Sequence, residues 1–210
     1  MEKWGWLAPT ALVLATAAVW PWRHLLTADA IAARSPRQSL LAAAFLIALY
    51  GAKSLSVAFP LSALEAAGGL LFPFPAALAV NLLGVGVAQT VPFFLGRREH
   101  GGLDALLTRR PGLASLGRIG TERPGRAVFL LRLGGVSPGD LVSLYLGAAG
   151  VPWRAYLVPG LLGSLPRVAA ATVLGSALWD IGGRRFWFSL AIGAALTGAS
   201  LVLWAVSRRR

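Results

Sequence analysis

The sequence predicts an all-α, polytopic transmembrane helical protein with two opposed re-entrant hairpins in a pseudo-symmetric inverted repeat. Hydrophobic residues make up 56% of the chain and charged residues only 13%, against the roughly 25% charged residues of a soluble domain. Several apolar runs are long enough to cross a hydrocarbon core of about 30 Å. Two further apolar segments are interrupted by glycine, proline and an acidic residue, which favours helices that turn back inside the membrane.

The N-terminal region, residues 1–38, is expected to contain a transmembrane helix and an interfacial helix. Residues 4–22 are apolar, with tryptophans near both ends, as an aromatic belt requires. A cleaved signal peptide is the alternative, because residues 15–17 resemble a small-residue cleavage site. Residues 23–38 mix basic and apolar side chains. They predict a short amphipathic helix or a loop, which Pro36 ends.

The central region, residues 39–180, is predicted to form the main membrane domain. It contains three apolar runs of spanning length and two apolar segments that are broken by glycine and proline. The expected spans cover residues 40–57, 76–95 and 151–178, and the broken segments cover residues 59–75 and 127–150.

The two broken segments resemble each other in composition. Each contains a proline, glycines and an embedded acidic residue, and each precedes a full span. Paired interruptions of this kind point to the transport site of repeat-built transporters. The residues expected to shape these hairpins are Pro60, Gly68, Gly69, Pro138 and Gly147.

The rest of the chain is strongly basic. Residues 97–126 hold seven arginines and predict an interfacial amphipathic helix or a solvated loop. Residues 181–210 are expected to hold a last span over 186–206 and a basic tail. Basic loops mark the cytoplasmic side, which places the C-terminus in the cytoplasm. The composition, rich in arginine and poor in lysine, suggests a multi-pass protein of a bacterial inner (plasma) membrane.

The net charge of +12 indicates which partners to expect. The basic residues stand between apolar runs, so the expected partners are membrane lipids, with anionic headgroups at the cytoplasmic loops. No aromatic–basic stacking pattern accompanies them, and nucleic acid is therefore not expected. The sequence is also compatible with a homo-oligomer.

Several kinds of chemistry lack the residues they need. The chain has no cysteine and two histidines, His24 and His100, far apart in sequence. No thiolate or histidine metal site is expected, and a Ser-His-Asp triad has little to build on. No glycine-rich phosphate loop is present. We therefore expect neither an enzyme nor a cofactor.

Four charged residues are candidates for a substrate or proton site. Glu65 lies in a stretch otherwise free of charge, where a carboxylate must be paired, protonated or lining a cavity. Arg132 could pair with Glu65 or Asp140, or bind a lipid phosphate. Arg167 could be the partner of an acid. The structural alternatives are an interfacial position or a helix cap for Glu65, interfacial anchoring for Arg132, turn or cap chemistry for Asp140, and a kink near the surface for Arg167.

Other polar residues of the central region have simpler explanations. Lys53 and Arg97 are expected to anchor helix ends, unless the fold turns them inward. Asn81 and Gln89 lie within a span, where hydrogen bonds between helices explain them.

Several motifs follow one another in a characteristic order over roughly residues 45–180. They are Phe59-Pro60, Glu65 to Gly69, Phe93 to Arg97, Arg132-Leu133, Asp140-Leu141, Leu146 to Pro152 and Gly163 to Pro166. This order resembles the DedA superfamily, also called the VTT-domain or SNARE-associated Golgi protein family. The resemblance implies two re-entrant hairpins that face each other from opposite leaflets. It also implies lipid movement between leaflets: eukaryotic relatives look like phospholipid scramblases, and bacterial relatives look like translocases for undecaprenyl phosphate or phosphatidylethanolamine, some of them linked to proton gradients.

The resemblance also extends to single positions. By match, Glu65 takes the place of the acid of the first hairpin, and Arg132 that of the first arginine of the second hairpin. Phe93 and Arg97 belong to a family motif. The second arginine of the typical bacterial branch is missing from residues 136–140, which puts undecaprenyl phosphate in doubt as the substrate.

Three functions follow as hypotheses. The first is a lipid translocase or scramblase-like transporter that moves phospholipid or polyprenyl-phosphate headgroups between leaflets. The second is a proton-coupled transporter of a small solute or ion, with Glu65 as the proton site. The third is a non-transporting membrane scaffold.

Overall fold

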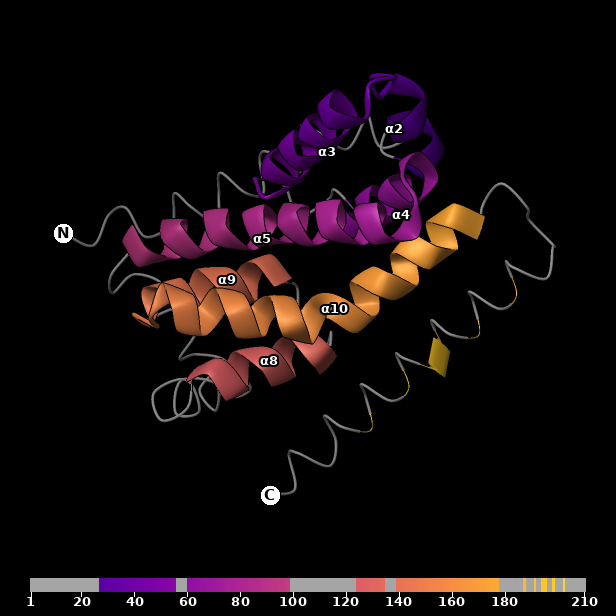
Figure 1. Ribbon diagram of the computed structural model, residues 1–210. Coiled ribbons are helices and arrows are strands. Elements are labelled where there is room, and N and C mark those ends of the chain that lie inside the picture. The colour runs from indigo at the N-terminus through magenta and orange to yellow at the C-terminus, as the bar shows by residue number, and fades with distance from the viewer. Residues whose placement is uncertain are drawn as a thin grey trace.

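The computed structural model describes residues 27–55, 60–98, 124–134 and 139–177, together with six single positions from 187 to 202. Within these residues the chain forms α-helices and no strand, which confirms the all-α prediction for them (Figure 1). The predicted span over 4–22 lies outside the described residues, as do most of the basic stretch 97–126 and of the span 186–206. The helices are α2 (Ala28–Arg34), α3 (Ser39–Lys53), α4 (Leu61–Leu71), α5 (Phe74–Arg98), α8 (Pro124–Gly134), α9 (Gly139–Ala148) and α10 (Trp153–Ala177).

The short helix α2 lies within the segment 23–38, where a helix or a loop was predicted. The hydroxyl of Thr27 accepts a hydrogen bond from the backbone of Ala30 and caps the first turn. The helix ends at Ser35, directly before Pro36. Ile31 is buried and anchors α2 in the core.

Two helices, α5 and α10, are long and apolar enough to cross a membrane. Each has 25 residues, which is about 37 Å of helix at about 1.5 Å per residue. They confirm as helices the spans that were predicted over 76–95 and 151–178. α3 is a shorter apolar helix of 15 residues, and it covers most of the predicted span 40–57.

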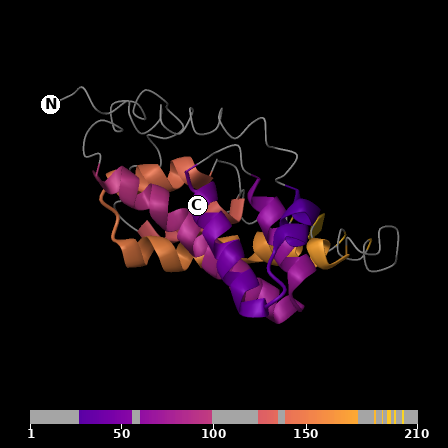
Figure 2. The same cartoon turned by 90° about the horizontal axis from the view of Figure 1, so that it is seen from above.

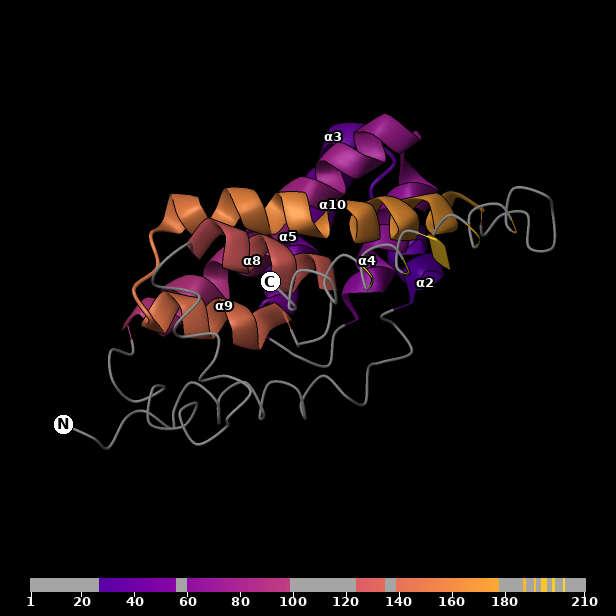
Figure 3. The same ribbon diagram turned by 90° about the horizontal axis from the view of Figure 1, so that it is seen from below.

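The short helices gather at opposite ends of α10. α8 and α9 lie toward one end and α2 and α4 toward the other (Figures 1 and 3). α3 packs on α5 (Figure 2). As a result, α4 packs on α10, although α4 directly precedes α5 in the chain, and α9 packs on α5, although it directly precedes α10.

Glycines make both of these contacts close. A Cβ atom on Gly69 of α4 would lie 2.0 Å from the carbonyl oxygen of Thr172, and one on Gly175 of α10 would lie 2.1 Å from that of Ala66. The contact between α9 and α5 has the same form. There, a Cβ atom on Gly147 would lie 1.9 Å from the Phe93 oxygen, and one on Gly96 would lie 1.9 Å from the Leu144 oxygen. Small residues let helix backbones touch, so main chain meets main chain at both contacts.

The expected break at Gly68-Gly69 is wrong. Both glycines lie inside α4, which continues to Leu71. Packing on α10 and α5 outweighs their low helix propensity, and they serve helix contact instead of a turn. A Cβ atom on Gly68 would lie 2.3 Å from Oδ1 of Asn81. Pro60 directly precedes α4, and Pro138 lies outside the described residues.

Candidate functional site

A cavity of about 270 Å³ lies between the two long helices and the ends of the shorter ones. Its wall includes the last turn of α3, the start of α4, the middle of α5, the end of α8, the start of α9 and the middle of α10. Three cations and one carboxylate contribute to the lining. The charged and amide side chains are those of Lys53, Gln89, Arg132, Asp140 and Arg167.

Glu65 and Arg167 form an ion pair that joins α4 to α10. Nη1 of Arg167 lies 2.8 Å from Oε1 of Glu65 and donates a hydrogen bond of 2.9 Å to Oε2. The Glu65 side chain is fully buried, whereas that of Arg167 is 42% exposed. Of the partners that the sequence offered for Glu65, the fold therefore selects Arg167, and it places the carboxylate in the protein interior.

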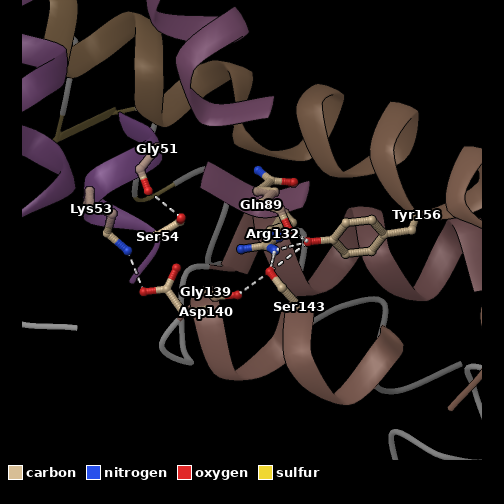
Figure 4. A network of polar contacts seen from close by, with 9 residues as sticks. All are labelled: Gly51, Lys53, Ser54, Gln89, Arg132, Gly139, Asp140, Ser143 and Tyr156. Carbon is tan, nitrogen blue, oxygen red and sulfur yellow. Dashed lines mark hydrogen bonds and ion pairs between the residues drawn. The ribbon is translucent and has the colours of Figure 1, made fainter. Parts of the chain in front are cut away.

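Lys53 and Asp140 form a second ion pair, between the end of α3 and the start of α9 (Figure 4). Both side chains are largely buried. Lys53 is thus turned inward by the fold and does not anchor the helix end at a membrane surface. Asp140 stands in the first turn of α9, where a negative charge also suits the helix dipole.

Arg132 pairs with neither of the two acids that the sequence suggested as its partners, Glu65 and Asp140. Its Nη2 donates a hydrogen bond of 2.7 Å to Oγ of Ser143 and one of 2.8 Å to the Tyr156 hydroxyl (Figure 4). The guanidinium carbon lies 5.8 Å from the centre of the Tyr156 ring, within reach of a cation–π attraction. Two neutral hydroxyl groups therefore hold this arginine at the cavity wall.

Asn81 joins four helices behind the cavity. Its amide nitrogen donates to the carbonyl oxygen of Glu65 at 2.8 Å and to the hydroxyl of Thr172 at 2.9 Å. Its amide oxygen accepts a hydrogen bond of 3.0 Å from the Tyr50 hydroxyl. These bonds hold α4, which carries Glu65, against α5 and α10.

Gln89 also bonds across helices, as expected. It donates a hydrogen bond of 3.2 Å to Ser164 of α10. Phe93 is buried, and its ring stacks on that of Tyr156 with 4.4 Å between the centroids. Arg97 lies exposed in the last turn of α5, away from the residues that line the cavity.

Sequence reasoning missed Tyr156 and Ser143 as site residues. Tyr156 looks like an ordinary aromatic residue near the start of a span, and Ser143 like a small polar residue of a hairpin. One signal was present for Lys53, a cation late in an apolar run. For Ser143, the signal is position: it lies four residues before Gly147, as Glu65 lies four residues before Gly69.

A comparison with protein families matches residues 59–177 to the VTT domain, more than half of the 210-residue chain. The chain belongs to the VTT-domain family. This is the domain of DedA and SNARE-associated Golgi proteins, and it confirms the resemblance seen in the motifs. The match includes Glu65, Arg132, Asp140 and Arg167, all four candidate site residues. The comparisons with curated proteins and with solved structures give no significant match.

The VTT domain carries a membrane-associated, transporter-like role. The two helices of membrane-spanning length both lie inside the matched range. Among the described residues, no three histidine, cysteine or acidic side chains gather as metal ligands would.

Proposed function

We propose that this VTT-domain protein moves lipids between membrane leaflets, without nucleotide hydrolysis, by accepting their headgroups in the polar cavity. The observation that carries this proposal is the cavity itself, lined by Lys53, Arg132 and Arg167 and flanked by α5 and α10. A charged headgroup needs polar partners at membrane depth. The acyl or polyprenyl chains need none and stay in lipid outside the helices.

The placement of the short helices supports two re-entrant hairpins. α4 has 11 residues and α9 has 10, whereas a helix needs about 20 residues to span the bilayer. Each short helix starts at the cavity. Through glycine contacts, α4 packs on α10, the long helix that follows α9, and α9 packs on α5, the long helix that follows α4. The two contacts are alike in form, which favours an inverted repeat. In this proposal residues 39–180 act as one domain in the bacterial inner membrane.

The substrate class proposed is a phospholipid or polyprenyl-phosphate headgroup. Such a group carries a phosphate, which arginine binds well through several N–H groups. Glu65 contributes by holding Arg167 at the wall, and Asp140 by holding Lys53. If the cavity serves as a path through the membrane, these pairs must loosen for a bound headgroup to pass on between the helices.

A lipid-exchange assay on purified protein in liposomes tests the proposal. It measures how fast fluorescent phospholipid of the inner leaflet becomes accessible to an external quencher. We expect wild-type protein to speed exchange, and Glu65→Gln and Arg132→Ala to slow it by about tenfold or more. Arg126→Ala is the matched control, because Arg126 is an exposed arginine of the same helix as Arg132 and does not line the cavity.

A proton-coupled solute transporter is the second candidate, since the buried Glu65 carboxylate faces a cation at the cavity wall. Proton-driven solute uptake that Glu65→Gln abolishes, without lipid exchange in wild-type protein, would favour this candidate. Well-folded protein that shows neither activity would favour a scaffold.

A further inference from the structure

The three cations of the cavity wall differ in what holds them. Lys53 is paired with Asp140, and Arg167 with Glu65. Arg132 has hydroxyl partners instead of a carboxylate among the described residues. A carboxylate neutralises the charge of its partner, whereas a hydroxyl group leaves that charge in place. Arg132 is thus the cavity cation whose charge is available to a ligand without breaking an ion pair.

The hydrogen bonds around Arg132 form a consistent relay. Both N–H groups of Nη2 are used, one by Ser143 and one by Tyr156. The Tyr156 hydroxyl donates to Ser143 at 2.6 Å, and the Ser143 hydroxyl donates to the carbonyl oxygen of Gly139 at 2.8 Å. Each hydroxyl group therefore accepts from the guanidinium and donates onward. The Tyr156 hydroxyl has a second acceptor within reach, the carbonyl oxygen of Gln89 at 3.2 Å. Within the part of the chain that the structure describes, these hydrogen bonds hold the guanidinium through Nη2.

The hydroxyl groups of Ser143 and Tyr156 do not use the other two nitrogens of Arg132, Nε and Nη1. Nε is buried and has no hydrogen-bond partner among the described residues. Nη1 lies against Gly139 at the start of α9, which also lines the cavity. A buried N–H group without a partner costs free energy, and an anion that accepts from it would remove this cost.

We propose that Tyr156 and Ser143 are positioning residues that hold Arg132 so that its Nε and Nη1 bind an oxyanion of a phosphate group in the cavity. This inference rests on the proposed function for the identity of the phosphate carrier, a lipid headgroup. The binding chemistry itself does not require transport. Tyr156 is well suited to the role because it is fully buried and its ring is fixed by stacking on Phe93.

The test measures binding to the full-length protein in detergent. The probe is short-chain dihexanoyl phosphatidylglycerol, titrated by calorimetry, with inorganic phosphate as a second probe. We expect Arg132→Ala to abolish binding, and Tyr156→Phe and Ser143→Ala each to weaken it about tenfold, as the loss of one hydrogen bond to a charged group predicts. Phosphatidylglycerol binding alone identifies a lipid site, and binding of both probes identifies recognition of the phosphate itself.

Tyr50→Phe is the matched control. Tyr50 is likewise a fully buried tyrosine whose hydroxyl forms a hydrogen bond across helices, but the partner of that hydroxyl is Asn81 and not Arg132. We expect its probe affinity to stay within about twofold of wild type. A general loss of packing would weaken binding in both tyrosine variants, and that outcome would overturn the proposal.

A double-mutant cycle separates positioning from structure. In the background Arg132→Lys, which keeps the charge but cannot make the same two bonds, Tyr156→Phe is expected to change affinity less than threefold. A full tenfold loss in that background would show that Tyr156 acts independently of Arg132. The two proposals can fail separately. Probe binding that these variants weaken as expected, with no lipid exchange, would reject lipid translocation and leave the role of Tyr156 in place. Lipid exchange without this effect of the variants on binding would reject the role of Tyr156.

Discussion

Glu65 and Arg167 stand 102 residues apart in sequence, and their side chains meet within 2.9 Å. The pair is asymmetric, because the carboxylate is fully buried and the guanidinium is 42% exposed. Its two members should therefore respond differently to substitution. A partly exposed arginine can turn to another partner, and a buried carboxylate cannot.

Arg167→Met is expected to destabilise the protein more than Glu65→Gln does. Removing the cation leaves a buried carboxylate without compensation, which costs about 3–5 kcal/mol in fully buried pairs, and we expect about 2–3 kcal/mol here because Arg167 is partly exposed. The measurement is the unfolding midpoint of the purified protein in detergent. Arg126→Met, at an exposed position of α8, should change stability by less than about 0.5 kcal/mol. Equal losses for Arg167→Met and Glu65→Gln would contradict the asymmetry.

Lys53→Met and Asp140→Asn should each lower stability, and the double variant should lose less than the two losses combined. Both side chains are largely buried, and each single change leaves one charge without its partner. We expect a coupling energy of about 1–3 kcal/mol from a double-mutant cycle of unfolding free energies. Additive losses would mean that the two residues do not depend on each other.

Gly96→Ala is expected to prevent normal folding or to cost at least about 2 kcal/mol, because its Cβ atom would lie 1.9 Å from the backbone oxygen of Leu144. A backbone atom cannot move aside as a flexible side chain can. Gly86→Ala is the control on the same helix. Its nearest neighbour, Cδ2 of Leu161, lies 3.8 Å away, and the change should be neutral or stabilise by up to about 1 kcal/mol. Yields and unfolding midpoints of the two variants check this, and similar values would argue against the close contact of α5 with α9.

Asn81→Leu should cost about 2–4 kcal/mol of unfolding free energy. The change keeps the size of the side chain but leaves the Tyr50 hydroxyl and the Glu65 carbonyl group buried without their partner. Thr90→Val, also on α5, removes a hydrogen bond within the helix and should cost less than about 1 kcal/mol. Comparable losses in thermal unfolding would show that Asn81 does not join the helices as described.

Hydropathy was sufficient to predict the long helices. α5 and α10 follow from continuous apolar runs, and their internal residues Pro92, Pro159 and Pro166 do not end them. The state of Gly68-Gly69 could not be predicted in this way. The low helix propensity of glycine disfavours a helix there, and the contacts of α4 with α10 and α5 explain why the helix continues.

The partners in the cavity were also beyond local reasoning. Glu65 stood out as a lone acid in an apolar stretch, but the sequence offers Lys53, Arg132 and Arg167 as cations, and spacing along the chain does not choose among them. The choice depends on how α4 crosses α10. The hydroxyl groups that hold Arg132 were harder still to predict, because a tyrosine in an apolar helix carries no sign of its partner.

The glycine contacts of α4 and α9 have a consequence for how such a protein can change. Main-chain atoms fix the place of both short helices, whereas side chains such as Arg132 and Gln89 form the wall of the cavity between them. The placement of the short helices and the chemistry of the cavity are therefore encoded at separate positions. Cavity residues can be exchanged while the glycine contacts keep the short helices in place, which makes this domain a suitable frame for redesigning the chemistry of its cavity.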